Sequence, residues 1–349
     1  MEGPASARLL DWEAAGRFGS RLAGSGPRLN RAQRDRLRRD FGEFVTEAEG
    51  LVTHLTGLSV DGSPTRSWVM SRSAWIRTNL QGFEGALAPF AERLAERSGD
   101  GALSAVRRKV LAAQVGGLLG YMGRKVLGQY DLFVPRENQD LLYFVGPNVA
   151  ELEARYGFEP REFRLWLCLH EVAHRVQFAG VPWLRPYLRG MIDGYLASIE
   201  LDGRKLIQTI RRAREEAARG RSDGLGVLFS LMTPRQRETF LRMQAVMSLL
   251  EGHGNYVMSA LSAGRIQGEP RMRRTLARRR HGPVDRVIQK AVGLDIKVRQ
   301  YAIGERFVAR VVQRAGMEGF NRVWEREEYL PTLDEVGSPD LWLDRMATS

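Results

Sequence analysis

The segment Pro160 to Gly180, PREFRLWLCLHEVAHRVQFAG, constrains the fold more than any other part of the chain. Pro160 suits the first position of a helix, where its missing N–H would have no partner anyway, and Gly180 followed by Pro182 is a stop signal. The interval therefore predicts one helix. Because the residues around its two histidines are apolar nearly all round, we expect this helix to be buried and its polar groups to be paired.

Three polar side chains in this helix form the pattern H-E-x-x-H. His170 and His174 are four residues apart, so both imidazoles leave the same face and can reach a single ion. Glu171 is offset by about 100° from His170 around the helix, which places it close enough to take a proton from a bound water. The pattern is typical of a catalytic zinc site with His170 and His174 as ligands and Glu171 as the base. The alternative is a hydrogen-bonded network of the same residues within the core.

A catalytic zinc needs a third protein ligand, and the best source is the segment Leu249 to Met258. It lies in a long predicted helix that begins at the capping box of Thr233 and Gln236. Glu251 and His253 are both possible ligands, but they diverge by about 200° around the helix, so one ion is not expected to take both. We favour Glu251 and keep His253 as the alternative ligand or as a donor to the transition state.

Other residues of the chain are assigned supporting roles. Asn255 lies one turn beyond Glu251, where its amide could orient a ligand histidine. Tyr256 and Tyr187 are further candidates for stabilising an oxyanion. Gly252 and Gly254 would let another backbone approach closely. Cys168 is interpreted as a small buried hydrophobic residue, with a nucleophile or ligand as the alternative.

Helical periodicity dominates the rest of the sequence, and the fold class it predicts is mainly α (α+β), a helical domain with a small β-sheet. The clearest strand is Leu141 to Val145, LLYFV, with Tyr130 to Val134 as a possible neighbour. Apolar residues recur at helical spacing in the ranges 31–56, 68–97, 102–127, 160–179, 183–218, 234–261 and 300–316.

Length and cysteine content bound the organisation of the chain. Its 349 residues are expected to form a single domain over 1–349, with the core of the metal site at about 127–262. The single cysteine excludes an intramolecular disulfide and a cysteine-ligated zinc site. Since the N-terminus lacks the apolar stretch of a signal peptide and no membrane span is expected, the sequence predicts a cytoplasmic protein. The oligomeric state is left open.

The formal charge of +12 is compatible with binding to nucleic acid or to an anionic membrane, and the densest basic run is Arg271 to His281. No aromatic residues interleave with these arginines for base stacking, so we expect a solvated surface and no specific binding of nucleic acid. The alternative function is a non-catalytic basic module that binds nucleic acid or an acidic partner and retains a structural metal site or none. An intact Glu171 favours the enzyme, because a structural site has no use for an adjacent base.

Several motifs along the chain are similar to those of one known family. They are HEVAHRVQF followed by Val181 to Leu184, LLEGH at Leu249 to His253 with Val257 and Met258, LGQYDLF at Leu127 to Phe133, FVGPN at Phe144 to Asn148, Lys297 with Gln300 and Tyr301, Leu330 to Thr332, and Trp342 with Leu343 and Arg345.

With these motifs the chain resembles the zincin-like metallopeptidases that genome annotation ties to deazaflavin coenzyme biosynthesis. The resemblance covers nearly the whole chain. It implies a zincin-like fold, Zn²⁺ on His170 and His174, Glu171 as the catalytic base and the helix of Glu251 as the source of the third ligand. Together, residues and resemblance predict a zinc-dependent hydrolase, a metallopeptidase whose substrate is a peptide or another amide.

Overall fold

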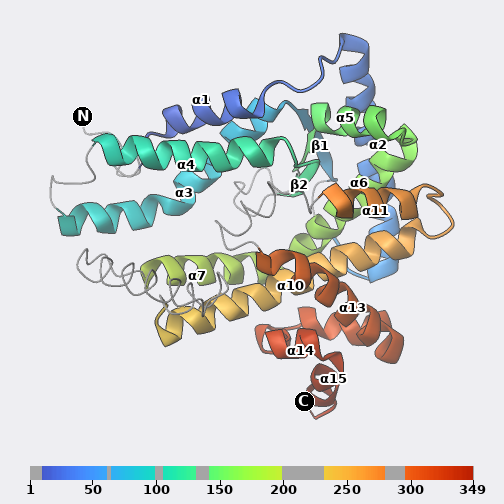
Figure 1. Cartoon of the computed structure of the whole chain (residues 1–349). Coiled ribbons are helices and arrows are strands. Elements are labelled where there is room, and N and C mark those ends of the chain that lie inside the picture. The colour runs from blue at the N-terminus through green and yellow to red at the C-terminus, as the bar shows by residue number, and fades with distance from the viewer. Residues whose placement is uncertain are drawn as a thin grey trace. The chain divides into compact units, whose positions relative to one another are not determined.

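The computed structural model describes residues 10–60, 64–98, 105–130, 141–198, 232–279 and 295–348. Helices dominate these residues and the strands form one small sheet, which confirms the predicted class (Figure 1). None of the described helices combines the length and the apolar character needed to cross a bilayer. The helices are α1 Trp12–Ala23, α2 Arg31–Thr56, α3 Arg72–Ser98, α4 Ala105–Gly123, α5 Gly146–Tyr156, α6 Pro160–Gly180, α7 Leu184–Ala197, α10 Pro234–Ser262, α11 Glu269–Arg279, α13 Asp295–Asn321, α14 Leu333–Gly337 and α15 Pro339–Ala347, with short 3₁₀ turns η4 Arg322–Trp324 and η5 Glu327–Tyr329.

Two compact units can be distinguished in the chain. The first comprises residues 1–52, 61–175 and 264–269, and the second comprises residues 53–60, 176–263 and 270–349. Helices α2 and α6 contribute residues to both units. The single domain over 1–349 stays a prediction.

The first unit contains the sheet, whose strand order is β1-β3-β2. The central strand β3, Leu141–Val145, is the predicted LLYFV run, and Leu142 to Val145 are all buried. It pairs in parallel with β1, Arg66–Met70, and antiparallel with β2, Gly128–Tyr130. A short continuous apolar run fits a strand that has neighbours on both sides.

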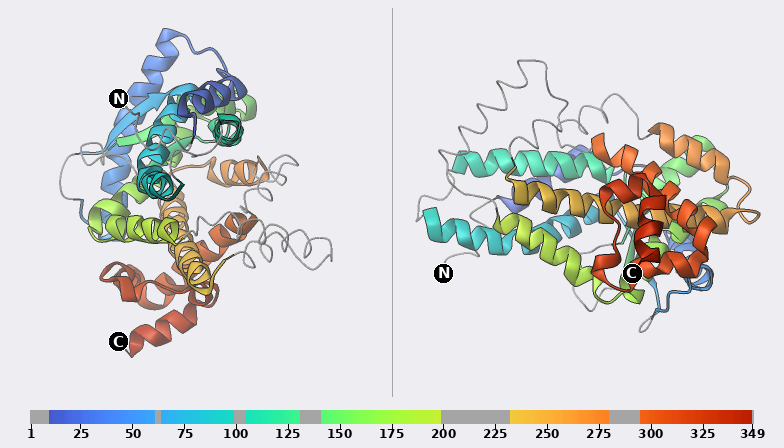
Figure 2. Two further views of the ribbon diagram at one scale, coloured as in Figure 1. Left: turned by 90° about the vertical axis from the view of Figure 1, so that its left-hand side faces the viewer. Right: turned by 90° about the horizontal axis from the view of Figure 1, so that it is seen from below.

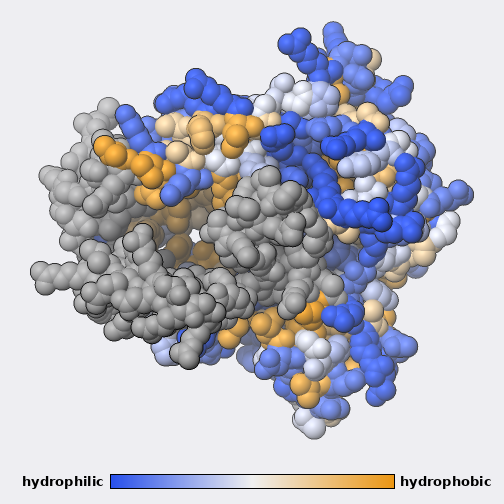
Figure 3. Space-filling model, viewed as in Figure 1, coloured by the Kyte–Doolittle hydropathy of each residue, from blue (hydrophilic) through white to orange (hydrophobic). Residues whose placement is uncertain are grey.

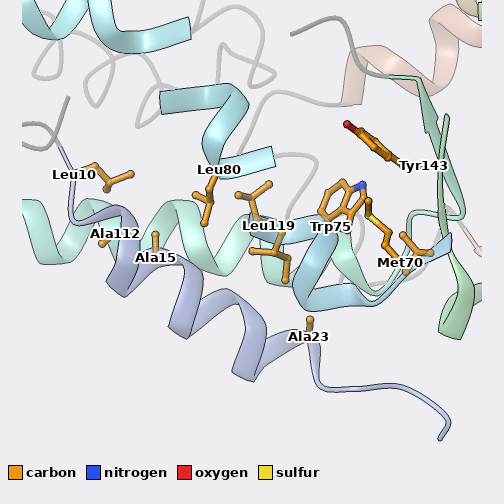
Figure 4. Close-up of a cluster of buried hydrophobic side chains, with 11 residues drawn as sticks. Leu10, Ala15, Ala23, Met70, Trp75, Leu80, Ala112, Leu119 and Tyr143 are labelled. Atoms are coloured by element: carbon orange, nitrogen blue, oxygen red, sulfur yellow. The ribbon is translucent and has the colours of Figure 1, made fainter. Parts of the chain in front are cut away.

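The core of the first unit lies between the sheet and the helices α1, α3 and α4. Trp75 and Ile76 of α3 pack with Met70 of β1, Leu119 of α4 and other apolar side chains (Figure 4). The end view in Figure 2 shows α1, α4 and α3 side by side. Trp75 also donates from its indole N–H to the side-chain oxygen of Gln129 on β2, at 2.5 Å. This bond ties the helical layer to the edge strand of the sheet.

Buried ion pairs fix the first half of α6 within the first unit. The Arg164 guanidinium donates two hydrogen bonds to Glu153 of α5, at 2.8 and 2.7 Å, and a third to Asp40 of α2. Only 6% of the Arg164 side chain is exposed. A bidentate arginine pair of this kind sets the orientation of the helix that bears it.

The second unit is built around α10 and α13. Helix α10 begins at the predicted capping box, in which Thr233 and Gln236 each accept from the other's backbone N–H. A Cβ on Gly252 would lie 2.2 Å from the carbonyl carbon of Gly304 on α13, so the prediction of a close backbone approach at Gly252 is confirmed. The two helices meet here at a distance that only glycine allows.

The structure corrects several predicted element bounds. The range 68–97 was expected to be one helix, but Trp68 to Met70 belong to strand β1 and the helix starts at Arg72. Strand β2 is Gly128–Tyr130, whereas the range 131–134 of the predicted neighbour strand lies outside the described residues. Helix α4 ends at Gly123, before the predicted end at residue 127, and residues 102–104 of the predicted range lie outside the described residues.

Two further helices differ from their predicted ranges. Helix α7 ends at Ala197, and residues 199–218 of the predicted helix lie outside the described part of the chain. Helix α13 extends past the predicted end at residue 316, but the backbone leaves the helical conformation at Gly316, where φ is 72° and ψ is 176°. The sequence pattern thus located the break while missing the continuation beyond it.

The basic run predicted to be solvated begins on helix α11. Met272 and Leu276 are buried, whereas Arg271 and Arg274 are exposed. Arg273 donates to Glu305 of α13 at 3.0 Å. The prediction of a solvated surface is therefore confirmed for Arg271 and Arg274. Arg280 and His281 lie outside the described residues.

Candidate metal centre

Helix α6 presents its two histidines to one point, as the four-residue spacing predicts. The Nε2 atoms of His170 and His174 lie 3.3 Å apart, and the two rings are inclined at 85°. Two nitrogens bound to one tetrahedral zinc at 2.0–2.1 Å are separated by about the same distance, roughly 3.3 Å. Both histidines are half-buried.

A carboxylate completes a three-residue cluster with these histidines. His170, His174 and Glu251 each offer one ligand atom, and these atoms all lie within 4.8 Å of one another. Two imidazoles and one carboxylate form a donor set used by catalytic zinc sites, which leave a coordination position open. The residues therefore fit a zinc ion, and the set brought together is the one favoured from the sequence.

A hydrogen-bonded glutamine sets the position of the Glu251 segment against the end of α6. Gln177 lies three residues after His174 on the same helix and is fully buried. Its side-chain amide donates to the carbonyl oxygen of Leu250 at 3.0 Å and lies 2.7 Å from Nδ1 of His253. Because Leu250 directly precedes Glu251, this contact fixes the α10 backbone next to the carboxylate.

His253 occupies a different environment from Glu251, as their separation around the helix predicts. It is fully buried and stacks on Phe320, with ring centroids 5.2 Å apart and an angle of 8° between the planes. Trp324 contacts the same ring edge-on at 5.6 Å. His253 therefore packs against aromatic side chains of the second unit and contacts the side-chain amide of Gln177.

Glu171 lies on the other side of the motif, against the edge strand β2. Its Oε2 accepts a hydrogen bond from the backbone N–H of Tyr130 at 3.0 Å, and only 8% of the residue is exposed. A Cβ on Gly128 would lie 2.7 Å from Oε1 of Glu171, so glycine is the only residue that leaves the carboxylate where it is. Strand β2 thus holds the Glu171 carboxylate in place through the N–H of Tyr130 and the absence of a side chain at Gly128.

The comparison with protein families identifies the group of proteins to which this geometry corresponds. The sequence matches the family of zincin-like metallopeptidases over residues 10–343. The chain belongs to this family. The zincin-like fold class and the family resemblance expected from the sequence are thereby confirmed.

One solved structure is similar to this zincin-like chain over almost its whole length. It is the crystal structure of a "putative hydrolase with a novel fold" from Chloroflexus aurantiacus, with 32% sequence identity and a TM-score of 0.74. The match covers 98% of the present chain and 100% of the other. Among curated proteins no match is found.

The remaining predicted residues of this zincin-like chain lie as follows. Asn255 and Tyr256 are half-buried on α10, and the backbone carbonyl of Asn255 accepts from the Ser259 hydroxyl at 2.7 Å. Burial raises the pKa of Tyr187, although the nearby Arg242 acts in the opposite direction. Their roles as an orienting residue or as oxyanion donors stay predictions.

Cys168 is buried as predicted, with none of its surface exposed. Burial raises the pKa of its thiol well above the usual value, and the charges of Glu171 and Glu47 add to that shift. A fully buried thiol with a raised pKa is a poor nucleophile, and Cys168 is not part of the cluster of possible metal ligands. The interpretation of Cys168 as a small core residue is confirmed.

Sequence reasoning missed three residues that position the candidate site, namely Gly128 and Tyr130 beside Glu171 and Gln177 beside the Glu251 segment. For Gln177 a signal existed, because a polar side chain one turn after His174 on an otherwise apolar helix needs a partner. For the two residues of β2 no local signal existed. Glycine next to a short strand usually indicates a turn. The hydrogen bond of a backbone N–H does not depend on the residue type, so the sequence cannot predict it.

Proposed function

We propose that this protein is a zinc-dependent hydrolase and that it cleaves a peptide bond or a related amide. The observation that carries the proposal is the convergence of His170, His174 and Glu251, whose ligand atoms lie within 4.8 Å of one another. Membership of the zincin-like metallopeptidase family supports the same conclusion. The catalytic assignment to Glu171 is part of the proposal.

The proposed mechanism assigns a separate task to each residue. Zinc held by His170, His174 and Glu251 would lower the pKa of a bound water towards about 7 and polarise the substrate carbonyl. Glu171 would take a proton from the attacking water and later deliver it to the leaving amine. The Tyr130 N–H donates to Oε2 of Glu171 at 3.0 Å and so orients the carboxylate that would take the proton.

The proposal is tested by exposing a peptide library to protein loaded with zinc. We expect cleavage that stops when a chelator removes the metal and returns when zinc is restored, because the water needs the ion to ionise near neutral pH. Mass spectrometry of the products gives the cleaved bonds. If neither peptides nor small amides are cut by the zinc-loaded protein, the proposed hydrolase activity is wrong.

The third ligand is tested by comparing two variants of α10. Glu251→Ala removes a proposed ligand, so zinc affinity should fall by more than about 100-fold, beyond the loss usual for a supporting residue. His253→Ala removes a group that contacts Gln177 and Phe320, so zinc affinity should change by less than about 10-fold. Competition with a fluorescent chelator measures both constants. The opposite order would assign the ligand role to His253.

A further inference from the structure

Helix α4 exposes apolar side chains along one face while the opposite face is packed into the core. Ala112 and Leu119 are buried in the core of the first unit. In contrast, Val106 is 70% exposed, Val110 is 52% exposed and Leu111 is 37% exposed. A helix of a folded protein usually presents polar residues on its solvent side, so this face requires an explanation.

Helix α1 extends this surface, because glycines bring the two helices very close together. A Cβ on Gly116 would lie 2.4 Å from the carbonyl oxygen of Ala15 on α1. Phe18 and Leu22 of α1 lie across Gly117 and Gly120 of α4 and are 46% and 45% exposed. We call this surface the α1–α4 apolar face. It consists of Phe18, Leu22, Val106, Val110 and Leu111. Figure 3 shows hydrophobic residues gathered over these two helices.

Positively charged residues lie near both ends of α4. Arg108 and Lys109 lie near the start of the helix, and Arg124 and Lys125 directly follow its end. Helix α4 contains no acidic residue. On α1 the charge of Glu13 is balanced by Arg17, with which it forms an ion pair, and Arg21 adds a further positive charge.

We propose that the α1–α4 apolar face docks the protein on an anionic membrane surface. Apolar side chains bordered by lysine and arginine are the pattern of helices that lie in the plane of a lipid interface, where the cations meet the phosphate groups. A second copy of the chain is a poorer occupant. Since both ends of α4 are cationic, either direction of pairing between two α4 helices would bring like charges together.

The apolar face would enter the interface without unfolding. Because the inner side of α4 contacts the protein core, only the outer side can enter the lipid, and the helix would lie flat on the surface. This binding mode is independent of the zinc site and of the proposed hydrolase activity.

The test is co-sedimentation of the protein with vesicles of phosphatidylcholine, with and without enough phosphatidylglycerol to give an appreciable negative surface potential. We expect binding to the anionic vesicles and little binding to the neutral ones. Val106→Ser with Val110→Ser should weaken binding by about 10-fold, since both side chains are exposed and neither supports the core. The matched control is Leu341→Ser, a residue of α15 that is 53% exposed.

Charge is tested by a second pair of variants. Arg108→Glu with Lys109→Glu should weaken binding by about 10-fold or more, because each cation near an anionic surface contributes about a factor of five. Arg36→Glu with Arg39→Glu makes the same change of net charge on the exposed side of α2 and should bind like the wild type.

Three results would overturn the proposal. The first is no binding of the wild type to anionic vesicles. The second is an equal loss in the two charge variants, which would show an effect of net charge alone. The third is a dimer in solution that Val106→Ser with Val110→Ser dissociates, which would assign the face to a second copy. Circular dichroism of every variant checks that the fold is intact.

Discussion

Glu171→Gln should lower kcat for peptide hydrolysis by about 100-fold or more while the zinc content and the fold persist. Glutamine has the size of glutamate and can still accept the hydrogen bond from the Tyr130 N–H, so the packing against β2 is retained. It cannot take a proton from water, and the reaction loses its base. The measurement is the initial rate on a peptide cleaved by the wild type, together with elemental analysis of the same preparation.

A matched substitution separates the loss of the base from a general effect of removing charge. Glu318→Gln changes an exposed glutamate of α13 and should leave kcat unchanged. A Glu171→Gln protein that hydrolyses peptide at the wild-type rate would show that another group accepts the proton. In that case the zinc ligands could still be correct, but the role assigned to Glu171 would be wrong.

The second large effect is expected when both histidines of α6 are removed. His170→Ala with His174→Ala should reduce bound zinc from about one ion per chain to none, because one carboxylate alone cannot hold the ion. Hydrolysis should then fall to background. Elemental analysis of protein purified without chelator measures the metal.

His54→Ala is the matched control, since this histidine is exposed on α2. It should retain the full zinc content. If the double variant keeps its zinc as well, the ion is bound elsewhere in the chain. Both variants should show the helical spectrum of the wild type, because the two α6 histidines are only half-buried.

The sequence was most informative where one local pattern determines the structure. Pro160 and Gly180 bound helix α6 as predicted, and the capping box at Thr233 and Gln236 starts α10. Each of these features depends on contacts within a few residues, so the pattern is complete in the sequence. The spacing of His170 and His174 belongs to the same class.

Elements whose structure depends on distant partners were predicted less well. Strand β1 was assigned to a helix, because a five-residue run with apolar members fits either structure until its pairing with β3 is known. Gly146 and Pro147 directly follow strand β3 and begin helix α5, where proline suits the first turn. Periodicity alone does not distinguish a stop from a new start.

The candidate site shows the same division between local and distant information. His170, Glu171 and His174 follow from a single helix, whereas Glu251 lies 77 residues after His174 and no local spacing connects the two segments. The residues that position the base and the third ligand come from other elements. Tyr130 contacts Glu171 through its backbone N–H, and Gln177 contacts the backbone of α10. Neither interaction can be predicted from the neighbouring residues in the sequence.

Gly128 is constrained by the chemistry of the site instead of by the fold, and this has a consequence for a mutational scan of the chain. Its backbone lies in the edge strand β2, but a Cβ there would meet Oε1 of Glu171, the flexible end of a side chain that can move aside. Gly128→Ala should therefore accumulate as folded protein while kcat falls, with zinc binding unchanged. Gly42→Ala, where a Cβ meets nothing within 4 Å, should affect neither quantity. In a library of variants scored separately for protein abundance and for hydrolysis, substitutions at position 128 should leave abundance unchanged and lower hydrolysis.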